Sequence, residues 1–254
     1  MEKKLIKFSL IDNAKDSLCH AVEHLTNPDG IAPTDLKHAI RDVAHVVELL
    51  LKERLHQIHP VFIWENIDKY PSKNANTVRI DVAMERLLKL AGIVLTEDHK
   101  KTISACKKIR NSIVHYEFEI DEKEGKVIIG RLLSFVFGFS KQYLGLDLEK
   151  EFRSDDRWRF LLDLWWFWDA HSAALEKELS EQGKPIWECP SCHAVTFDIS
   201  ESECLLCGHS DELIECDMCN NAIFESETET IREIEGDSYT ICKDCIERID
   251  KDRY

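Results

Sequence analysis

The chain has 254 residues, with 48 acidic and 33 Lys or Arg side chains, which gives a formal net charge of −15 at pH 7. Hydrophobic residues make up 44% of it and there are only nine Gly and six Pro, which excludes a disordered, collagen-like or linker-dominated chain. The length is enough for one or two domains, each with its own core. A uniformly acidic surface would also be a poor nonspecific binder of nucleic acid, because its field repels phosphate.

The charge is distributed unevenly along the chain. Residues 184–254 contain six Lys or Arg against eighteen Asp or Glu, a net charge of −12, whereas the first 183 residues carry a net charge of only −3. This abrupt change predicts two domains with different functions, residues 1–183 and residues 184–254, joined by a hinge at residues 183–185.

Helical spacing of apolar residues predicts that residues 1–183 are mainly α-helical. We expect helices over residues 10–25, from an N-cap at Thr34 to Ile58, over residues 81–90, and from an N-cap at Thr96 to about His115. The polar face of the second helix is expected to face solvent, and it carries Arg41, His45, Glu48, Lys52 and His56.

The chain after the fourth helix favours a different local structure. Alternation over residues 116–120, a charged turn at residues 121–125 and a β-branched run at residues 126–129 predict a short β-hairpin. Two further helices are expected, over residues 131–143 and 155–181. The last contains four tryptophans with apolar groups on more than one face, so we expect it to lie in a core or a dimer contact rather than to stack on bases.

The cysteines are concentrated in the acidic domain. Eight of the ten form four C-x-x-C pairs there. The N-terminal sequence does not resemble a secretory signal, and the longest apolar stretch, residues 127–139, contains Arg131 and is too short to span a bilayer. We therefore expect a cytoplasmic chain with no membrane segment, in which paired thiols bind metal rather than form disulfides.

The spacing of these pairs predicts two tandem zinc ribbons, over about residues 187–210 and 214–248. Eight thiolates fill two tetrahedral sites, which indicates two structural zinc ions and none for catalysis. Sequential pairing of the knuckles is the default, a cross-braced arrangement stays open, and His193 or His209 could replace a cysteine. The expected ligands are Cys189, Cys192, Cys204 and Cys207 for one ion, and Cys216, Cys219, Cys242 and Cys245 for the other.

The acidic charge of this small β-rich zinc domain also indicates its partners. Thiolate coordination adds further negative charge, so the domain is a poor binder of nucleic acid. It is better suited to a basic protein partner, or to a basic face of the first domain, in regulation or recruitment.

The fourth helix ends in the motif Arg110-Asn111-x-x-x-His115. Asn111 and His115 are four residues apart and share a helix face, and the long Arg110 side chain can reach the same cleft. An imidazole exchanges protons near neutral pH, and a guanidinium binds phosphate through paired N–H groups. One imidazole is poorly suited to act as both base and acid in a single cleavage, so a symmetric dimer would supply the second.

Lysines on the same helix provide a candidate binding surface for RNA. Lys101, Lys107 and Lys108 are the predicted substrate-binding residues, with Lys100 beside them. Their local positive charge would attract the strand despite the acidic total. A solvated helix face is the alternative interpretation.

Residues 1–180 resemble the HEPN superfamily. The resemblance is carried by Arg110, Asn111 and His115 at the end of a late helix, and by the long preceding helix that includes His45 and His56. It implies a HEPN-like helical bundle that forms a homodimer and acts as a metal-independent endoribonuclease, in an antiviral defence or toxin role. In the toxin branch a Tyr commonly stands two places after the His, whereas here position 117 is Glu and Tyr116 is adjacent.

The same resemblance implies roles for the motif residues. One His115 would remove the proton of an RNA 2′-OH, and that of a second protomer would protonate the departing 5′-oxygen. Arg110 would stabilise the anionic phosphorus, and Asn111 would orient His115 or bind phosphate.

Two other functions fit the sequence. One is a noncatalytic module that binds a nucleotide or an RNA through Arg110 and His115. The other is a zinc-ribbon adaptor whose bundle only dimerises. All three functions predict zinc, but only the nuclease predicts RNA cleavage that is lost in His115→Ala.

Overall fold

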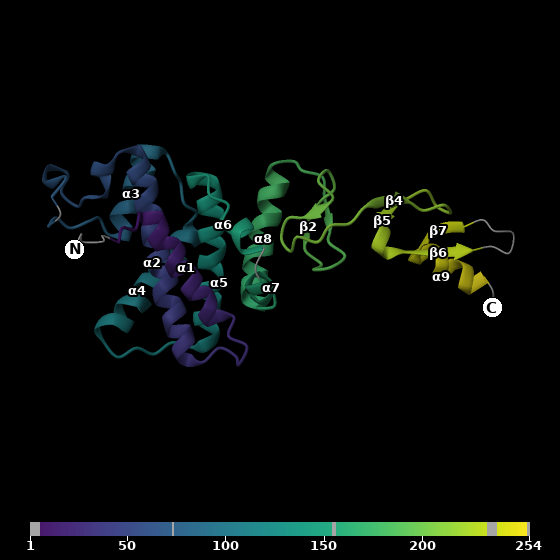
Figure 1. Ribbon diagram of the computed structural model, residues 1–254, viewed down its shortest axis with the longest axis horizontal. Helices are drawn as coiled ribbons and strands as arrows, with labels where there is room; N and C mark the ends of the chain where they lie inside the picture. The colour runs from purple at the N-terminus through teal and green to yellow at the C-terminus, as the bar shows by residue number, and fades with distance from the viewer. Residues whose placement is uncertain (1–5, 73, 154–155, 233–237, 253–254) are drawn as a thin grey trace, which may run out of the picture. The chain divides into compact units, whose positions relative to one another are not determined.

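The computed structural model describes residues 6–72, 74–153, 156–232 and 238–252. The chain divides into two compact units, Met1–His171 and Ser172–Tyr254 (Figure 1). The protein is mainly helical, with small antiparallel sheets in the cysteine-rich region, as the sequence predicts. The division between the units falls inside the last long helix, whereas the charge distribution places the boundary at residue 183.

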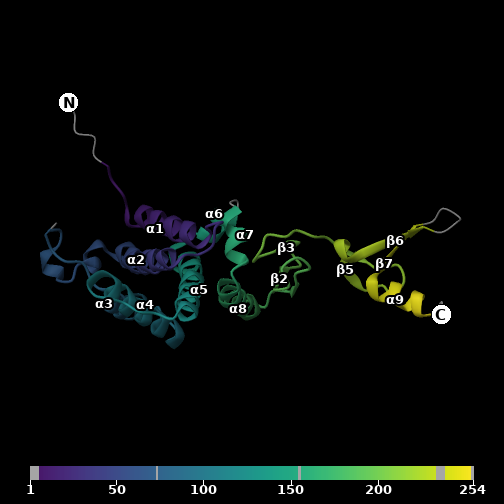
Figure 2. The same cartoon turned by 90° about the horizontal axis from the view of Figure 1, so that it is seen from below.

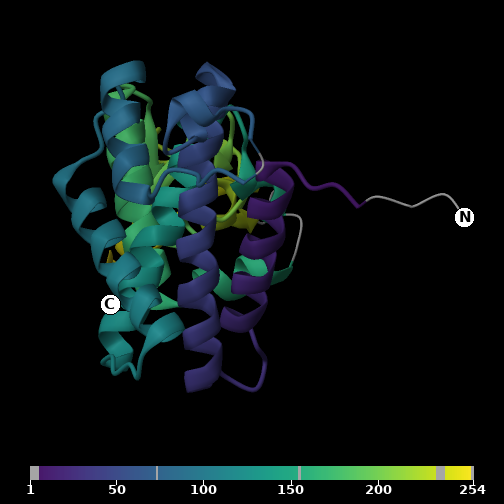
Figure 3. The same cartoon turned by 90° about the vertical axis from the view of Figure 1, so that its left-hand side faces the viewer.

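The first unit is a helical bundle built around one central helix. That helix, α2, packs against α1, α3, α4 and α5, and Figures 2 and 3 show α1 and α2 side by side. Its apolar stripe is fully buried in the core. The helices of the first unit are α1 (Leu10–Leu25), α2 (Pro33–Ile58), α3 (Ile80–Ala91), α4 (Glu97–His115), α5 (Glu122–Phe139), α6 (Leu148–Arg153) and α7 (Asp156–Leu162). Helix α8 (Trp165–Glu181) begins in this unit and ends in the second.

The N-termini of α4 and α2 are capped in different ways. Thr96 is the N-cap of α4, as predicted, and its hydroxyl accepts a hydrogen bond from the His99 N–H at 3.1 Å. The prediction of Thr34 as N-cap of α2 is wrong, because the helix begins at Pro33 with Ala32 as its N-cap residue. Proline is already in helical φ at the first position, and the Asp35 carboxylate accepts from the Ala32 N–H at 3.0 Å.

The predicted β-hairpin after α4 is absent from the residues that the structure describes there. Residues 117–121 form a loop, and α5 begins at Glu122 with Asp121 as its N-cap. The β-branched run at residues 127–129 is helical because it continues the buried face of α5. Packing against the bundle therefore outweighs the modest strand propensity of these residues.

Helix α5 is followed by a π-helical turn, Ser140–Leu144. Together they form the one stretch of the described chain, Glu122–Leu144, that is long and apolar enough to cross a membrane by length and composition alone. A buried core helix meets the same criterion, and 61% of the most apolar window of this stretch is buried inside the fold.

The single helix predicted over residues 155–181 is interrupted. Helices α7 and α8 are separated at Asp163 and Leu164. The break turns Trp158 and Phe167 toward each other, with ring centroids 5.7 Å apart, and both rings also contact Phe137 of α5. The tryptophan-rich segment thus contributes to the core, as predicted, although Trp165 stays exposed.

The second unit consists of short antiparallel sheets and a final helix. The first sheet has the order β1-β2-β3, and two hairpins follow, β4-β5 and β6-β7. Phe224 of β5 packs its ring against Phe197 of β2 at 4.7 Å, which joins the first sheet to the second. The elements are β1 (Ile186–Glu188), β2 (Val195–Asp198), β3 (Glu203–Cys204), β4 (Leu213–Glu215), β5 (Ala222–Phe224), β6 (Thr228–Arg232), β7 (Ser238–Cys242) and α9 (Lys243–Asp252).

Candidate functional site

Helix α4 presents its last turns to solvent while its middle is fixed in the core. Ile103 and Cys106 are buried, and the Cys106 thiol donates to the Ile40 carbonyl of α2 across 3.8 Å. Burial raises the pKa of this thiol to about 12, so Cys106 is an inert core residue. Arg110 lies one turn after Cys106, on the side of α4 that faces α2, whereas His115 is exposed at the end of the helix.

The three residues of the motif line one pocket. Its volume is about 530 Å³, and it opens between the end of α4, helix α2 and the start of α3. The predicted convergence of Arg110, Asn111 and His115 is therefore present in a single chain. The pocket is lined by Ala44, Glu48, Arg79, Ile80, Lys107, Arg110, Asn111, His115 and Tyr116.

Within the pocket, Arg110 and Asn111 are directly bonded. The Arg110 Nη1 donates to the Asn111 Oδ1 at 3.2 Å. The Arg110 side chain is half-buried and the His115 side chain is exposed. Asn111 thus contacts the guanidinium in this structure, and the role that the resemblance implies for it, to orient His115 or to bind phosphate, stays a prediction.

The predicted substrate-binding lysines are not brought together. Lys107 lines the motif pocket and forms an ion pair with Asp81. Lys101 lines a different pocket, together with Arg131, and Lys108 is exposed. Lys100 pairs with Glu97 at 2.8 Å. Of these lysines, then, only Lys107 shares a pocket with His115.

Two charged residues of the pocket were missed by sequence reasoning. Arg79 is the N-cap residue of α3, and Glu48 belongs to the face of α2 that was expected to be solvated. That expectation is wrong for Lys52, which is 7% exposed and donates to Glu48 and to the Thr77 hydroxyl. The sequence does contain a sign of this ion pair, because Glu48 and Lys52 are oppositely charged and four residues apart on one helix.

His45 of α2 lies within electrostatic range of the motif. Burial lowers the pKa of His45, and the positive charge of Arg110 lowers it further, while Glu48 opposes the shift. The lowered pKa favours the neutral form of the His45 imidazole, chiefly because the ring is half-buried. His45 is thus a titratable group on α2 whose pKa depends in part on the charge of Arg110.

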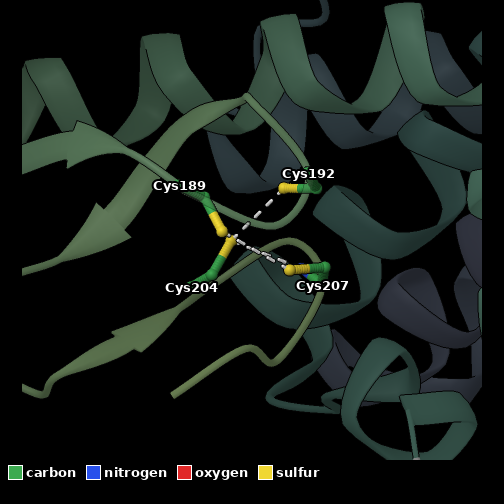
Figure 4. Close-up of side chains that lie close together, drawn as sticks. All are labelled: Cys189, Cys192, Cys204 and Cys207. Carbon is green, nitrogen blue, oxygen red and sulfur yellow. Dashed lines mark hydrogen bonds between the residues drawn. The ribbon is translucent and has the colours of Figure 1, made fainter. Parts of the chain in front are cut away.

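The first four-cysteine cluster has the geometry of a zinc site (Figure 4). The sulfurs of Cys189 and Cys207 are 3.8 Å apart, and those of Cys192 and Cys204 are 3.7 Å apart. Zn–S bonds of about 2.3 Å in a tetrahedron give sulfur separations of about 3.8 Å. The ligands are partly buried and receive N–H bonds from the knuckle backbone, so the cluster can hold a structural zinc ion.

The second cluster repeats this arrangement with Cys216, Cys219, Cys242 and Cys245. Its sulfur separations are 4.0 Å for Cys216–Cys245 and 3.9 Å for Cys219–Cys242. The Cys242 N–H donates to the Cys216 sulfur and lowers the pKa of that thiol to about 6. The pairing is sequential in both clusters, which rules out the cross-braced alternative for this structure.

The knuckle backbone explains how so few residues enclose each cluster. The residue after the second cysteine has positive φ in three of the four knuckles, at His193, Gly208 and Asn220. The fourth knuckle instead begins α9. The His193 ring is exposed and lies 3.4 Å from Glu188, and His209 lies 3.5 Å from Asp211, so neither histidine replaces a cysteine.

No family model, no characterised protein and no solved structure matches this sequence. What the chain shows by itself is a mainly helical N-terminal part followed by two four-cysteine clusters suggestive of zinc sites.

Proposed function

We propose that the protein is a metal-independent endoribonuclease that acts as a homodimer. The observation that carries the proposal is that Arg110, Asn111 and His115 line one solvent-open pocket at the end of α4. The resemblance of this motif to that of the HEPN superfamily supplies the reaction class. The accessible imidazole and the anchored guanidinium are the groups that the reaction needs.

The reaction is a transesterification at phosphorus. His115 of one protomer accepts the proton of an RNA 2′-OH as that oxygen attacks the adjacent phosphorus. The bond from phosphorus to the 5′-oxygen breaks, and His115 of the second protomer donates a proton to the leaving oxygen. The products are a 2′,3′-cyclic phosphate and a 5′-OH, so DNA cannot be a substrate because it lacks the attacking hydroxyl.

The charges in the pocket suit a phosphodiester. The pocket lining contains three cations, Arg79, Lys107 and Arg110, and one carboxylate, Glu48. Lys107 also pairs with Asp81 and Glu48 with Lys52, so the two arginines are the cations left to bind phosphate. Arg110 stabilises the charge that develops on the phosphoryl oxygens, and its bond to Asn111 limits its freedom before substrate arrives. One chain brings one histidine to this pocket, and the dimer supplies the second imidazole.

The two zinc ions have a structural role in this proposal. In each cluster four thiolates occupy all tetrahedral positions, which leaves none for water or substrate. The acidic zinc unit serves regulation or recruitment through a basic partner, in the cytoplasmic defence or toxin role that the resemblance implies.

Cleavage of RNA by the wild type and by His115→Ala tests the proposal. We expect His115→Ala to reduce cleavage by at least about 10²-fold, because it removes the proton-transfer group, while folding and dimerisation persist. His56→Ala is the matched control, since His56 is an exposed histidine of α2 outside the pocket. End mapping of the fragments should find 2′,3′-cyclic phosphate and 5′-OH ends, and brief chelation should leave cleavage intact.

The other outcomes separate the alternatives. RNA binding that depends on Arg110 without any cleavage by the wild type would indicate a noncatalytic binding module. Neither binding nor cleavage by the zinc-loaded wild type would indicate an adaptor. Equal cleavage by wild type and His115→Ala would contradict the assignment of His115.

A further inference from the structure

A second polar cluster lies between α1 and α2, separate from the motif pocket. Helix α1 contributes His20 and His24, and helix α2 contributes Asp35, His38 and Asp42. None of these five side chains lines the pocket of Arg110. These side chains come together because α1 and α2 pack against each other along an extensive interface.

Three of these side chains have the arrangement of metal ligands. His20, His24 and Asp42 each offer one ligand atom, and the three atoms lie within 4.8 Å of one another. The two histidines are four residues apart, so they project from one face of α1. Bonds of about 2.0–2.2 Å from a metal to nitrogen and oxygen give ligand separations of about 3.3–3.6 Å in a tetrahedron, so side-chain adjustments of about 1 Å or less would bring these atoms to binding distance.

The carboxylates also hold the histidine rings in place. Asp35 Oδ1 lies 2.8 Å from His24 Nδ1, and the other Asp35 oxygen is fixed by the Ala32 N–H. This bond to Nδ1 leaves the Nε2 of His24 as the nitrogen available to a ligand. A carboxylate behind a metal-binding histidine fixes the tautomer and raises the basicity of the ring in known sites.

An independent observation comes from His38. Its ring stacks on that of His24 with centroids 4.9 Å apart. Its Nδ1 is buried, and among the residues that the structure describes it has no hydrogen-bond partner. A buried imidazole nitrogen without a partner is costly in a purely structural network. A water bound to a metal ion beside His24 would be one partner for this nitrogen.

We propose that His20, His24 and Asp42 bind a divalent first-row transition-metal ion, with Zn²⁺ as the best fit. Two imidazoles and one carboxylate favour such an ion over Mg²⁺ or Ca²⁺, which prefer oxygen ligands alone. Three protein ligands leave a coordination position for water, unlike the thiolate clusters. His20 is half exposed, which provides access from solvent.

The neighbourhood predicts that this site binds metal less tightly than the thiolate clusters do. Arg41 Nε donates to Asp42 Oδ1 at 2.9 Å, and Asp42 Oδ2 lies 2.6 Å from His20 Nδ1, so a cation must compete for this carboxylate with a guanidinium and an imidazole. The site has three ligands where each cysteine cluster has four. During metal titration this site should therefore bind metal after the two cysteine clusters, and during chelation it should lose metal before them.

Metal titration of the full-length chain tests the proposal. Protein with zinc in both cysteine clusters is titrated with Co²⁺, and bound metal is counted after removal of free ion. We expect a third metal ion per chain, with visible Co²⁺ absorption that lacks the thiolate-to-cobalt charge-transfer band of the cysteine clusters. In His20→Gln and in the double variant His20→Gln/His24→Gln the count should stay at two, while His56→Gln should behave as wild type.

The controls keep folding apart from binding. His20→Gln changes a half-exposed side chain, so helix content by circular dichroism should match that of the wild type. The wild type should also show a rise in Tm with added Co²⁺ that is absent in His20→Gln. Two metal ions per wild-type chain at every Co²⁺ concentration, or a third ion that persists in folded His20→Gln, would overturn the proposal.

Discussion

At the scale of single residues, the positive charge of Arg110 lowers the pKa of His45 on α2. Because this charge and burial together lower the pKa of His45, Arg110→Ala should raise that pKa toward the ordinary value of 6.5. It should not reach 6.5, because burial is the larger cause and stays in place. Titration of the His45 ring protons by NMR measures the change.

The matched control for this prediction is Lys108→Ala, which removes an exposed cation of the same helix. It should leave the pKa of His45 nearly unchanged. Identical His45 titration curves in wild type and Arg110→Ala would mean that the guanidinium does not lie near α2 in solution.

The knuckle residue His193 provides a second test at this scale. Its φ of 61° is unfavourable for a residue with a Cβ, and glycine adopts that conformation without the steric cost. His193→Gly should therefore keep the zinc content and change the free energy of unfolding of the second unit by no more than about 1 kcal/mol, in the stabilising direction. Loss of one zinc ion in this variant, measured by metal analysis, would instead identify His193 as a ligand.

At the scale of elements, the contact between α5 and α8 depends on Gly130. A Cβ at this position would overlap the backbone carbonyl of Trp166, which has no freedom to move aside. Gly130→Ala should destabilise the helical unit by about 1–3 kcal/mol, as overpacking does in other cores. Urea unfolding followed by circular dichroism measures the difference.

Gly138 gives the matched control in the same helix. A Cβ there meets no atom within 4 Å, so Gly138→Ala should be neutral or stabilising by up to about 1 kcal/mol through helix propensity. Equal stability of Gly130→Ala and wild type would show that α5 and α8 do not approach each other as closely as described.

The sequence predicts helices well where the apolar spacing is long and uninterrupted. The first four helices were placed within a few residues of their observed ends, and the Thr96 cap was identified from its residue type. The β-branched residues 127–129 misled the prediction, because their local preference says nothing of the core that α5 completes. The break before α8 is likewise set by the packing of Trp158 and Phe167 on Phe137, a contact between distant segments.

The residues of the candidate sites could likewise be predicted where they lie close together in the sequence, and not where packing brings them together. The cysteine ligands follow from their spacing, because each knuckle closes locally. The motif residues on α4 were also identified from one short segment. Glu48 and Arg79 come from other elements and reach the pocket only through the packing of α2 and α3, so no local pattern could assign them.

At the scale of the whole molecule, the two units should respond differently to metal removal. Strong chelation should unfold the second unit, because its apolar core is small and three of the four buried residues around the second cluster are cysteines. The helical unit has its own extensive apolar core and should keep its structure. Limited proteolysis after chelation should cut within residues 172–254 and leave a helical fragment of about the first unit. Rapid cleavage within α2 or α5 would contradict the independence of the units.

The most direct test of a shared catalytic cleft is the activity of mixed dimers. Wild type and His115→Ala chains are mixed in equal amounts, allowed to exchange subunits, and assayed for RNA cleavage at constant total protein. If each cleavage needs His115 from both protomers, only wild-type dimers are active, and activity should be about a quarter of that of the wild type. Activity of about half would show that each protomer acts alone and would contradict the account.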